Sequence, residues 1–334
     1  MEKKNIPHNQ WEETSSLSSN HREKLSLLPG RADYHLHPGY SVDADPATVR
    51  QYCARALELD LQEICFTPHL EHETGRPNTN NLVRLHGKQV SSRDLRWLEA
   101  YFTEIEEARE EFQGSGLEIR VGIEIGYGPH LDEFIEKVLR EFSFDFVLGA
   151  VHSIYGISIS SIEECPEYFS LCSLEDLRKD YFRTLELAIQ SGFFDCLAHL
   201  DIYRRYGYEF YGEEILTIHR GVLGPLLEEA ARRRMGVEIN TSSIRRGGKE
   251  FHPSREILAM AEEAGVDIFT VGSDAHSPEE LGTDLEPAYQ LLEEAGQPVY
   301  IFRNRIPQVL PSPGEAKGEK ANLSPSRSTN ASRE

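Results

Sequence analysis

The sequence predicts an α/β fold, a distorted seven-stranded β/α barrel of the TIM-like kind. Seven short runs rich in Val, Ile, Leu and Phe alternate with longer amphipathic segments, the pattern of strands and helices in consecutive βα units. The runs are almost continuously apolar, which indicates parallel strands covered on both faces. The chain has 334 residues, enough for such a barrel in a single domain.

The predicted strands can be placed in chain order. They are residues 32–37, 63–69, 118–127, 144–153, 194–201, 236–243 and 267–276, and each run finishes in polar residues. Helical periodicity is clear at 45–60, 177–192, 224–236 and 253–265, several of which have Gly at the expected C-cap. Strands and helices are therefore expected to alternate along the chain.

The folded unit is predicted to span 29–310. Segments 1–28 and 311–334 are predicted to be disordered tails, because they hold too few apolar side chains to offset the entropy of ordering. Two long, polar, loop-like connections, 70–96 and 155–175, follow the second and fourth strands. Active sites of β/α barrels form on that side, so these connections are expected to wall a site; surface insertions without a role are the alternative.

The charge of the chain excludes some classes of partner. With 56 acidic and 35 basic residues the net charge is −21, so neither nucleic acid nor an anionic membrane is expected as a partner. No apolar run is long enough to cross a membrane, and residues 1–20 lack the apolar segment of a secretory signal. The five cysteines form no CxxC pair. A cytoplasmic protein with reduced thiols is predicted.

Side chains that can bind metals occupy the polar ends of the predicted strands. Six of the 13 histidines do so, together with acidic residues in the third and seventh runs and one just after the first. The nine residues are His35, His37, Asp43, His69, Glu124, His152, His199, Asp274 and His276. Because the carboxyl ends of barrel strands meet at one rim, these side chains are expected to lie together.

Nine ligands are too many for one metal ion. A structural zinc ion uses four protein ligands and a catalytic one uses three, so two or three ions are expected. The mixture of imidazole and carboxylate favours Zn, Mn or Fe over Mg or Ca. His35, His37, Glu124, Asp274 and His276 are the members of the set that are predicted to be catalytic.

Several divalent ions would make a compact positive site in a negatively charged protein. Such a site attracts phosphate and lowers the pKa of a bridging water towards neutrality, which generates a nucleophile. The chain has no GxSxG, Walker or HExxH motif and no GxGxxG after its first strand. Metal-assisted hydrolysis of a phosphoester is the predicted reaction.

Two pairs of arginines are candidates for binding the substrate phosphate. They follow the fifth and sixth strands and are Arg204, Arg205, Arg245 and Arg246.

The chain resembles the PHP (polymerase and histidinol phosphatase) family, and within it the histidinol-phosphatase branch. The resemblance covers about residues 31–305, through "DYHLHPGYSVDAD", "ICFTPH", "VGIEIGY", "VLGAVHSI", "LAHLDIYRRYG", "EINTSSIRRGG" and "TVGSDAHSPEELG". It implies a barrel of the PHP type with three metal ions at the strand ends, whose ligands fall on the same nine residues. It also implies that L-histidinol phosphate is hydrolysed to L-histidinol, a late step of histidine biosynthesis.

Two prolines depart from the family pattern. Pro38 stands where Thr usually follows the first histidine pair, and Pro68 precedes His69 where an Asp is often found. A hydroxyl and an acidic partner are therefore expected to be missing, which would affect metal affinity or acid catalysis. The alternative functions are a PHP phosphoesterase for a nucleotide, a sugar phosphate or phosphotyrosine, a non-catalytic metal-binding module, and an amidohydrolase-like enzyme.

Overall fold

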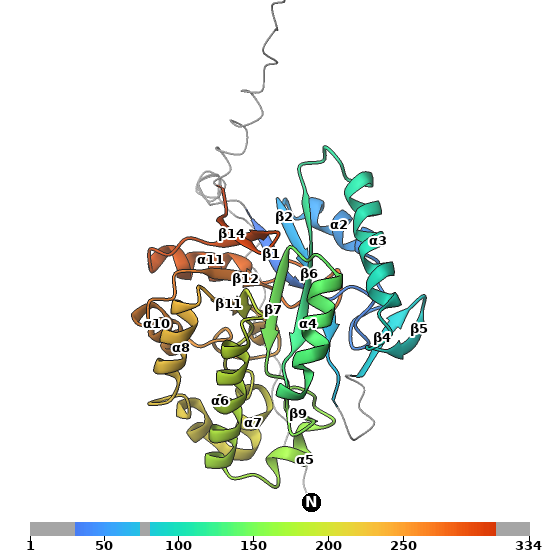
Figure 1. The fold of residues 1–334 in the computed structure, drawn as a ribbon. Coiled ribbons are helices and arrows are strands. Elements are labelled where there is room, and N and C mark those ends of the chain that lie inside the picture. Colours follow the sequence, from blue (N-terminus) through green and yellow to red (C-terminus); the bar gives the residue numbers. More distant parts are fainter. Residues whose placement is uncertain (1–30, 74–80, 312–334) are drawn as a thin grey trace, which may run out of the picture. The chain divides into compact units, whose positions relative to one another are not determined.

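Seven parallel strands form the wall of a nearly closed barrel (Figure 1). In the computed structural model, which describes residues 31–73 and 81–311, the strands are hydrogen-bonded in chain order. They are β1 (Ala32–Leu36), β2 (Glu63–Phe66), β6 (Glu118–Gly126), β7 (Phe146–Ala150), β10 (Cys196–Leu197), β11 (Gly236–Asn240) and β12 (Phe269–Gly272). The short strand β3 (His69–Leu70) also pairs with β6. The predicted α/β barrel is confirmed.

Within the described residues, Arg31–Leu310 form one compact unit. The predicted tails, 1–28 and 311–334, lie outside the described residues except for Pro311. Their disorder therefore stays a prediction.

The barrel closes where the chain leaves the carboxyl ends of β1 and β12, its first and last strands. Leu36 and Ala275 form a parallel bridge, and the amide of His37 donates to the carbonyl of Ala275 at 2.9 Å. The buried carboxylate of Asp33 adds two acceptors, one 2.8 Å from the amide of Ser273 and one 3.0 Å from that of Gly282. These contacts bring the "HLH" and "DAH" segments of the sequence side by side.

One main helix follows each barrel strand within the described residues, and these helices cover the outside of the barrel (Figure 1). They are α2 (Val49–Glu58), α3 (Arg96–Glu111), α4 (Asp132–Glu141), α6 (Leu174–Ser191), α8 (Leu223–Arg232), α10 (Arg255–Glu263) and α11 (Leu285–Glu294). Thr48 and Ser173 begin α2 and α6 with capping boxes. Gly192 ends α6 at a φ of 70°, a conformation that glycine adopts without strain.

A hairpin of β13 (Tyr300–Arg303) and β14 (Ile306–Val309) lies at the amino ends of the strands. The amide of Phe302 donates to the hydroxyl of Tyr34 at 2.8 Å. The rings of Phe302 and Phe146 pack at a tilt of 38°, with centroids 4.9 Å apart. This end of the barrel is therefore filled by aromatic side chains, and the opposite end is left for polar residues.

The two long connections hold regular elements of their own, whereas the sequence predicts loops there. In the first, β4 (Leu82–Leu85) and β5 (Lys88–Ser91) form an antiparallel hairpin. The second follows β8 (Ser153–Ile154) and contains β9 (Ile157–Ser158), which pairs with β8, and the short helix α5 (Cys165–Phe169). Elements of two to five residues offer too few positions for a recognisable periodicity, so their pattern is hidden among polar neighbours.

All seven barrel strands end before the last residue of the predicted run, and after β10 and β11 the chain turns into a helix. The run 194–201 contributes only Cys196–Leu197, because the chain leaves the extended conformation at His199, where φ is 25°. The run 236–243 ends at Asn240 and continues as α9 (Ser242–Arg245). A longer helix, α7 (Arg204–Tyr211), follows β10 in the same way. Both helices lie near the strand ends rather than on the outside of the barrel.

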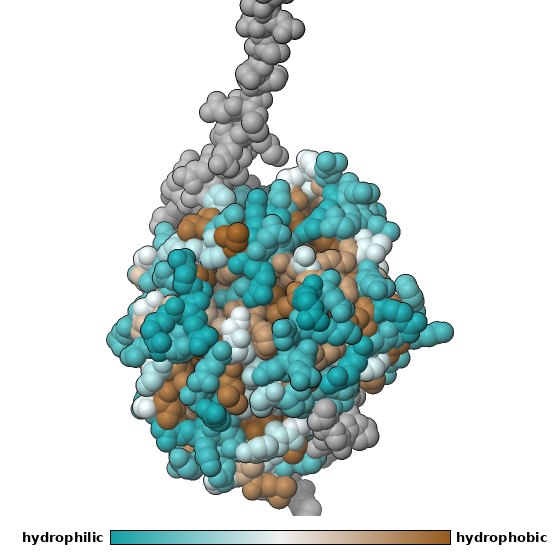
Figure 2. All heavy atoms as spheres, viewed as in Figure 1, coloured by the Kyte–Doolittle hydropathy of each residue, from teal (hydrophilic) through white to brown (hydrophobic). Residues whose placement is uncertain are grey.

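Hydrophilic residues cover most of the face of the folded unit that Figure 2 shows, with hydrophobic residues scattered among them. Charged residues make up 27% of the chain, which agrees with this surface. None of the helices in the described residues is both long and apolar enough to cross a membrane.

Gly149 of β7 packs directly against an aromatic ring. A methyl group at this position would lie 2.4 Å from Cγ of Phe194, so Gly149→Ala forces the ring or the strand to move. We expect the free energy of unfolding to fall by about 1–3 kcal/mol, the usual cost of overpacking a core. Urea denaturation followed by circular dichroism measures it. Gly224→Ala in α8 is the matched control, because nothing outside its own helix lies within 4 Å of the added methyl group. Equal losses in the two variants would contradict this account.

Candidate metal centre

All nine predicted ligand residues lie at the carboxyl end of the barrel. By element they are His35 in β1, His37 and Asp43 after it, His69 in β3, Glu124 in β6, His152 after β7, His199 after β10, and Asp274 and His276 after β12. Seven of them line a cavity of about 760 Å³. His35 and His37 do not line the cavity themselves but lie fully buried beside it. The predicted convergence of the nine side chains is observed.

The carboxylate of Glu124 stands at the centre of the group and is completely buried. Its Oε1 lies 2.9 Å from Nε2 of His199 and 3.3 Å from Nε2 of His152. Its Oε2 lies 2.8 Å from Nδ1 of His69 and 3.3 Å from Nε2 of His35. One carboxylate therefore lies within 3.3 Å of four imidazoles that come from four different strands or strand ends.

The two aspartates contact other imidazole nitrogens of the group. Oδ1 of Asp274 is 3.2 Å from Nε2 of His37. Oδ2 of Asp43 is 3.4 Å from Nε2 of His69 and 3.2 Å from Nε2 of His276. Among the described residues, three groups place their ligand atoms within 4.8 Å of one another: His35, His37 and Asp274; His37, His69 and His276; and His69, Glu124 and His152.

Several ligand atoms here are buried without a hydrogen bond. They are Nε2 of His35, Nε2 of His37, Nδ1 of His69 and Oε2 of Glu124. Buried polar atoms nearly always have a hydrogen-bond partner, and an unsatisfied one costs about 1–3 kcal/mol. The three nitrogens lie 2.8 to 3.6 Å from the same Oε2 atom. Divalent cations would satisfy all four atoms, so the residues present fit a metal centre.

Electrostatics keeps the central carboxylate ionised. Burial alone would raise the pKa of Glu124, but the imidazoles around it, His35 and His152 foremost, hold this pKa well below its usual value. Burial lowers the pKa of His37, and the neighbouring His69 lowers it further. A carboxylate and a neutral imidazole are the protonation states that bind metal ions.

Two buried carboxylates that the sequence does not single out support these imidazoles. Glu238 in β11 accepts a hydrogen bond from Nδ1 of His35 at 2.5 Å and one from the amide of His199 at 3.1 Å. Glu71 accepts one from Nδ1 of His152. Such acceptors fix the orientation of an imidazole and raise its basicity as a ligand. A glutamate inside the apolar run "GVEIN" is the signal that could have revealed Glu238.

The structure also shows what stands near the two prolines that depart from the family pattern. Oγ of Ser41 lies 3.3 Å from Nδ1 of His37 and accepts from the amide of His69 at 3.0 Å. A hydroxyl therefore lies beside His37 although Pro38 has none. Carboxylate oxygen lies 2.8 Å from His69 although Pro68 precedes it.

Two of the four predicted phosphate-binding arginines, Arg205 and Arg246, line the cavity. Nη2 of Arg205 donates to Oγ of Ser242 at 3.1 Å and lies 3.6 Å from Oδ2 of Asp274. Its Nε is buried without a hydrogen-bond partner. Arg205 thus presents a buried positive charge next to the metal-ligand group.

The sequence also predicts Arg204 and Arg245 as phosphate ligands, but their guanidinium groups are engaged elsewhere. Arg204 donates to Asp201 at 2.6 Å, and Arg245 donates to the carbonyls of Ser273 and Asp274 at 2.5 Å each. Neither lines the cavity. Adjacent residues of a helix point about 100° apart, so neighbours in sequence do not share a direction.

Residues 33–242 match the PHP domain family. The chain belongs to the PHP family. The matched segment contains seven of the nine candidate ligands, and Asp274 and His276 lie beyond it.

Relatives in the PHP family cover most of the chain. A probable histidinol-phosphatase from Deinococcus radiodurans is 30% identical over 278 residues, which is 83% of this chain and 98% of the relative. A histidinol-phosphatase from Lactococcus lactis is 25% identical over 268 residues, 80% of this chain and 91% of the relative. The crystal structure of histidinol phosphate phosphatase from Lactococcus lactis, complexed with Zn, L-histidinol and phosphate, has a TM-score of 0.69 at 24% identity. That match covers 83% of this chain and 98% of the other, and shows the same fold.

The pair of Glu71 and His152 gives a test by titration. Burial lowers the pKa of His152, but Glu71 and Glu124 raise it to about 9. In metal-free protein, the raised pKa of His152 adds to the free energy of unfolding. This contribution is fully present below the unfolded pKa of 6.5 and is lost as the pH rises through about 9. We expect Glu71→Gln to lower the pKa of His152, because one of the two carboxylates that stabilise its protonated form is then lost while the side chain stays buried. NMR titration of chelator-treated protein measures it, with Glu110→Gln on the exposed face of α3 as the control. A pKa that stays near 9 in Glu71→Gln would show that Glu71 does not cause the shift.

Proposed function

We propose that this protein is a metal-dependent phosphomonoesterase that hydrolyses L-histidinol phosphate to L-histidinol and phosphate. The observation that carries the proposal is the set of four buried, unsatisfied ligand atoms beside a cavity that arginine side chains also line. Relatives named histidinol-phosphatase align with most of the chain, at up to 30% identity. The solved relative from Lactococcus lactis holds zinc, L-histidinol and phosphate together.

The nine candidate ligands are the proposed metal-binding residues, and three divalent ions is the proposed number. Three overlapping groups of ligand atoms support this number, and the zinc in the solved relative supports Zn before Mn or Fe. When bound, such ions neutralise phosphate charge and lower the pKa of the attacking water. His35, His37, Glu124, Asp274 and His276 are proposed to act at the reacting phosphate through the ions that they hold.

Arg205 and Arg246 are the proposed phosphate-binding residues. The side chain of Arg205 is only 14% exposed, so its charge acts in surroundings that screen it weakly. Guanidinium groups bind phosphate oxygens through paired hydrogen bonds, which would orient the ester as well as attract it. Arg204 and Arg245 are not proposed as phosphate ligands, because neither lines the cavity and a carboxylate or backbone carbonyls accept hydrogen bonds from their Nη atoms.

One wall of the cavity favours a substrate that carries an ammonium group as well as a phosphate. Ser158, Ser160 and Ser161 line it together with Glu163 and Glu164. Carboxylates at this wall would attract the ammonium group of histidinol phosphate and repel the extra negative charge of a nucleotide. Other phosphomonoesters, including sugar phosphates and phosphotyrosine, are the alternatives that the assay below separates. The cytoplasm is the proposed location, supported by five free cysteines.

Phosphate release from a panel of esters tests the proposal. We expect the highest kcat/KM for L-histidinol phosphate, compared with a nucleoside monophosphate, a sugar phosphate, phosphotyrosine and an aryl phosphate, each with Zn, Mn or Fe. A chelator should abolish turnover and added metal should restore it. Glu124→Gln should be inactive and hold less metal, whereas His86→Asn, in the exposed turn between β4 and β5, should behave as wild type. Histidinol phosphate cleaved no faster than the aryl phosphate would refute the proposed substrate.

Removal of the Arg205 side chain tests its role at phosphate. We expect Arg205→Ala to lower kcat/KM by about 10–100-fold, because a charge-assisted hydrogen bond contributes about 1.5–3 kcal/mol. Metal content, measured by elemental analysis, should be unchanged. Arg232→Ala is the matched control, since that side chain is 71% exposed on α8. Unchanged kinetics in Arg205→Ala would exclude a phosphate contact.

A further inference from the structure

Asp43 differs from the other candidate ligands in how its position is fixed. Its side chain is 55% exposed, compared with 21% for His69 and 17% for His276, the two imidazoles that it contacts. It lies outside the strands and helices, in the connection between β1 and α2. The carboxylate lines the cavity, so few side chains pack around it, and the backbone on either side of it limits where it can lie.

The guanidinium group of Arg84, in β4, binds that backbone. Its Nη1 donates to the carbonyls of Ser41 and Ala44 at 2.7 Å each, and its Nη2 donates to the carbonyl of Val42 at 2.6 Å. Val42 and Ala44 are the two neighbours of Asp43 in the chain. One side chain from the hairpin thus binds backbone carbonyls of the residues before and after the candidate ligand.

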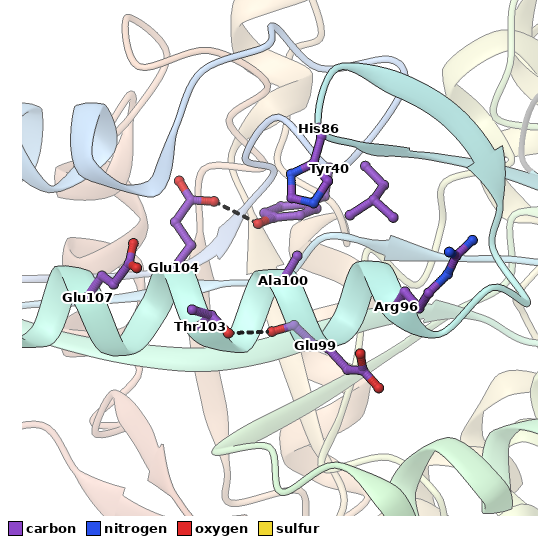
Figure 3. A pocket seen from close by; sticks show the side chains of 9 residues that line it. Tyr40, His86, Arg96, Glu99, Ala100, Thr103, Glu104 and Glu107 are labelled. Atoms are coloured by element: carbon purple, nitrogen blue, oxygen red, sulfur yellow. Dashed lines mark hydrogen bonds between the residues drawn. The ribbon is translucent and has the colours of Figure 1, made fainter.

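Further bonds join the same loop to the hairpin and to α3. The backbone amide of Arg84 donates to the carbonyl of Tyr40 at 2.8 Å, and Ser41 forms a bridge with Val83. The hydroxyl of Tyr40 donates to Glu104 of α3 at 2.8 Å, as Figure 3 shows. The loop is therefore held from the side of the hairpin as well as at its two ends.

On its other side, the loop contacts the segment that carries Asp274 and His276. The amide of Asp45 donates to the carbonyl of His276 at 2.8 Å. A shift of the loop would thus change the separation between Asp43 and His276. The Arg84 contacts limit that shift.

Only a guanidinium group suits this arrangement of acceptors. Three carbonyl oxygens that converge on one point repel one another unless a cation with several donors lies between them. Arginine offers five N–H donors in one plane and is always charged. Lysine offers a single ammonium nitrogen, which cannot donate to three carbonyls spread along a loop in the directions that the two Nη atoms of arginine do.

We propose that Arg84 is a positioning residue for the metal centre, acting through the backbone of residues 41–44 to place the Asp43 carboxylate opposite His69 and His276. The β4–β5 hairpin is then part of the metal site although it supplies no ligand. This inference rests on the proposed function, because it assumes that Asp43 binds a metal ion. Loss of Arg84 would increase the freedom of Asp43 and weaken the ion that Asp43 shares, without altering the barrel.

The test is zinc release from the full-length, zinc-loaded protein to a coloured chelator, with Zn²⁺ titration for affinity. We expect Arg84→Gln and Arg84→Lys to weaken the most loosely held zinc by about 10–100-fold, the usual effect of losing a residue that orients a ligand. Excess zinc should restore kcat, which a general structural defect would not allow. Lys88→Gln, an exposed change of the same charge in the same hairpin, is the matched control and should release zinc as wild type does.

Asp43→Asn distinguishes failure of the proposed metal ligand set from failure of the proposed role of Arg84. If Asp43→Asn loosens zinc and adding Arg84→Gln causes little further loss, the two residues act on one ion. If Asp43→Asn leaves zinc release unchanged, the proposed metal ligand set is wrong. If Asp43→Asn loosens zinc and both folded Arg84 variants hold it as wild type does, only the role of Arg84 is refuted. Melting temperatures from circular dichroism establish folding, and Arg84→Lys serves if Arg84→Gln does not fold.

Discussion

A buried carboxylate surrounded by imidazoles is the arrangement on which the rest of the site depends. Glu124 is inaccessible to solvent and contacts His35, His69, His152 and His199. Burial of a charge is costly unless partners compensate it, and nitrogens that lack hydrogen bonds add to that cost. The protein therefore gathers buried polar atoms at one point, where bound cations would satisfy those that lack a hydrogen-bond partner. Stability and metal binding are coupled for this reason.

The barrel makes such a concentration possible. Its parallel strands carry ligand residues from distant parts of the chain to one rim, and the bridge between Leu36 and Ala275 joins the first segment to the last. The opposite end is filled by Phe146, Phe302 and the hairpin that carries Phe302. Apolar packing thus occupies one end of the strands and the candidate site the other. Polar residues can therefore gather at the rim without disturbing the hydrophobic core.

Hydrogen-bond acceptors decide which arginines are available to a substrate. Arg204 and Arg245 are bound by a carboxylate and by carbonyls, as Arg84 is bound by the loop around Asp43. Arg205 and Arg246, in contrast, line the cavity. Guanidinium groups in this protein therefore have two uses: some hold the backbone near the site, and others present charge to the cavity.

The sequence by itself determined the order of strands and helices, the class of fold and the nine side chains at the strand ends. It could do so because apolar periodicity is a local property, and because the rim of a parallel barrel collects whatever follows each strand. Tertiary structure alone decided the roles of Glu71, Glu238 and Arg84, and which arginines face the cavity. These depend on the direction of single side chains towards partners that can be more than 200 residues away, as Glu238 is from His35. Local sequence patterns hold no information on such contacts, because packing of the whole barrel sets them.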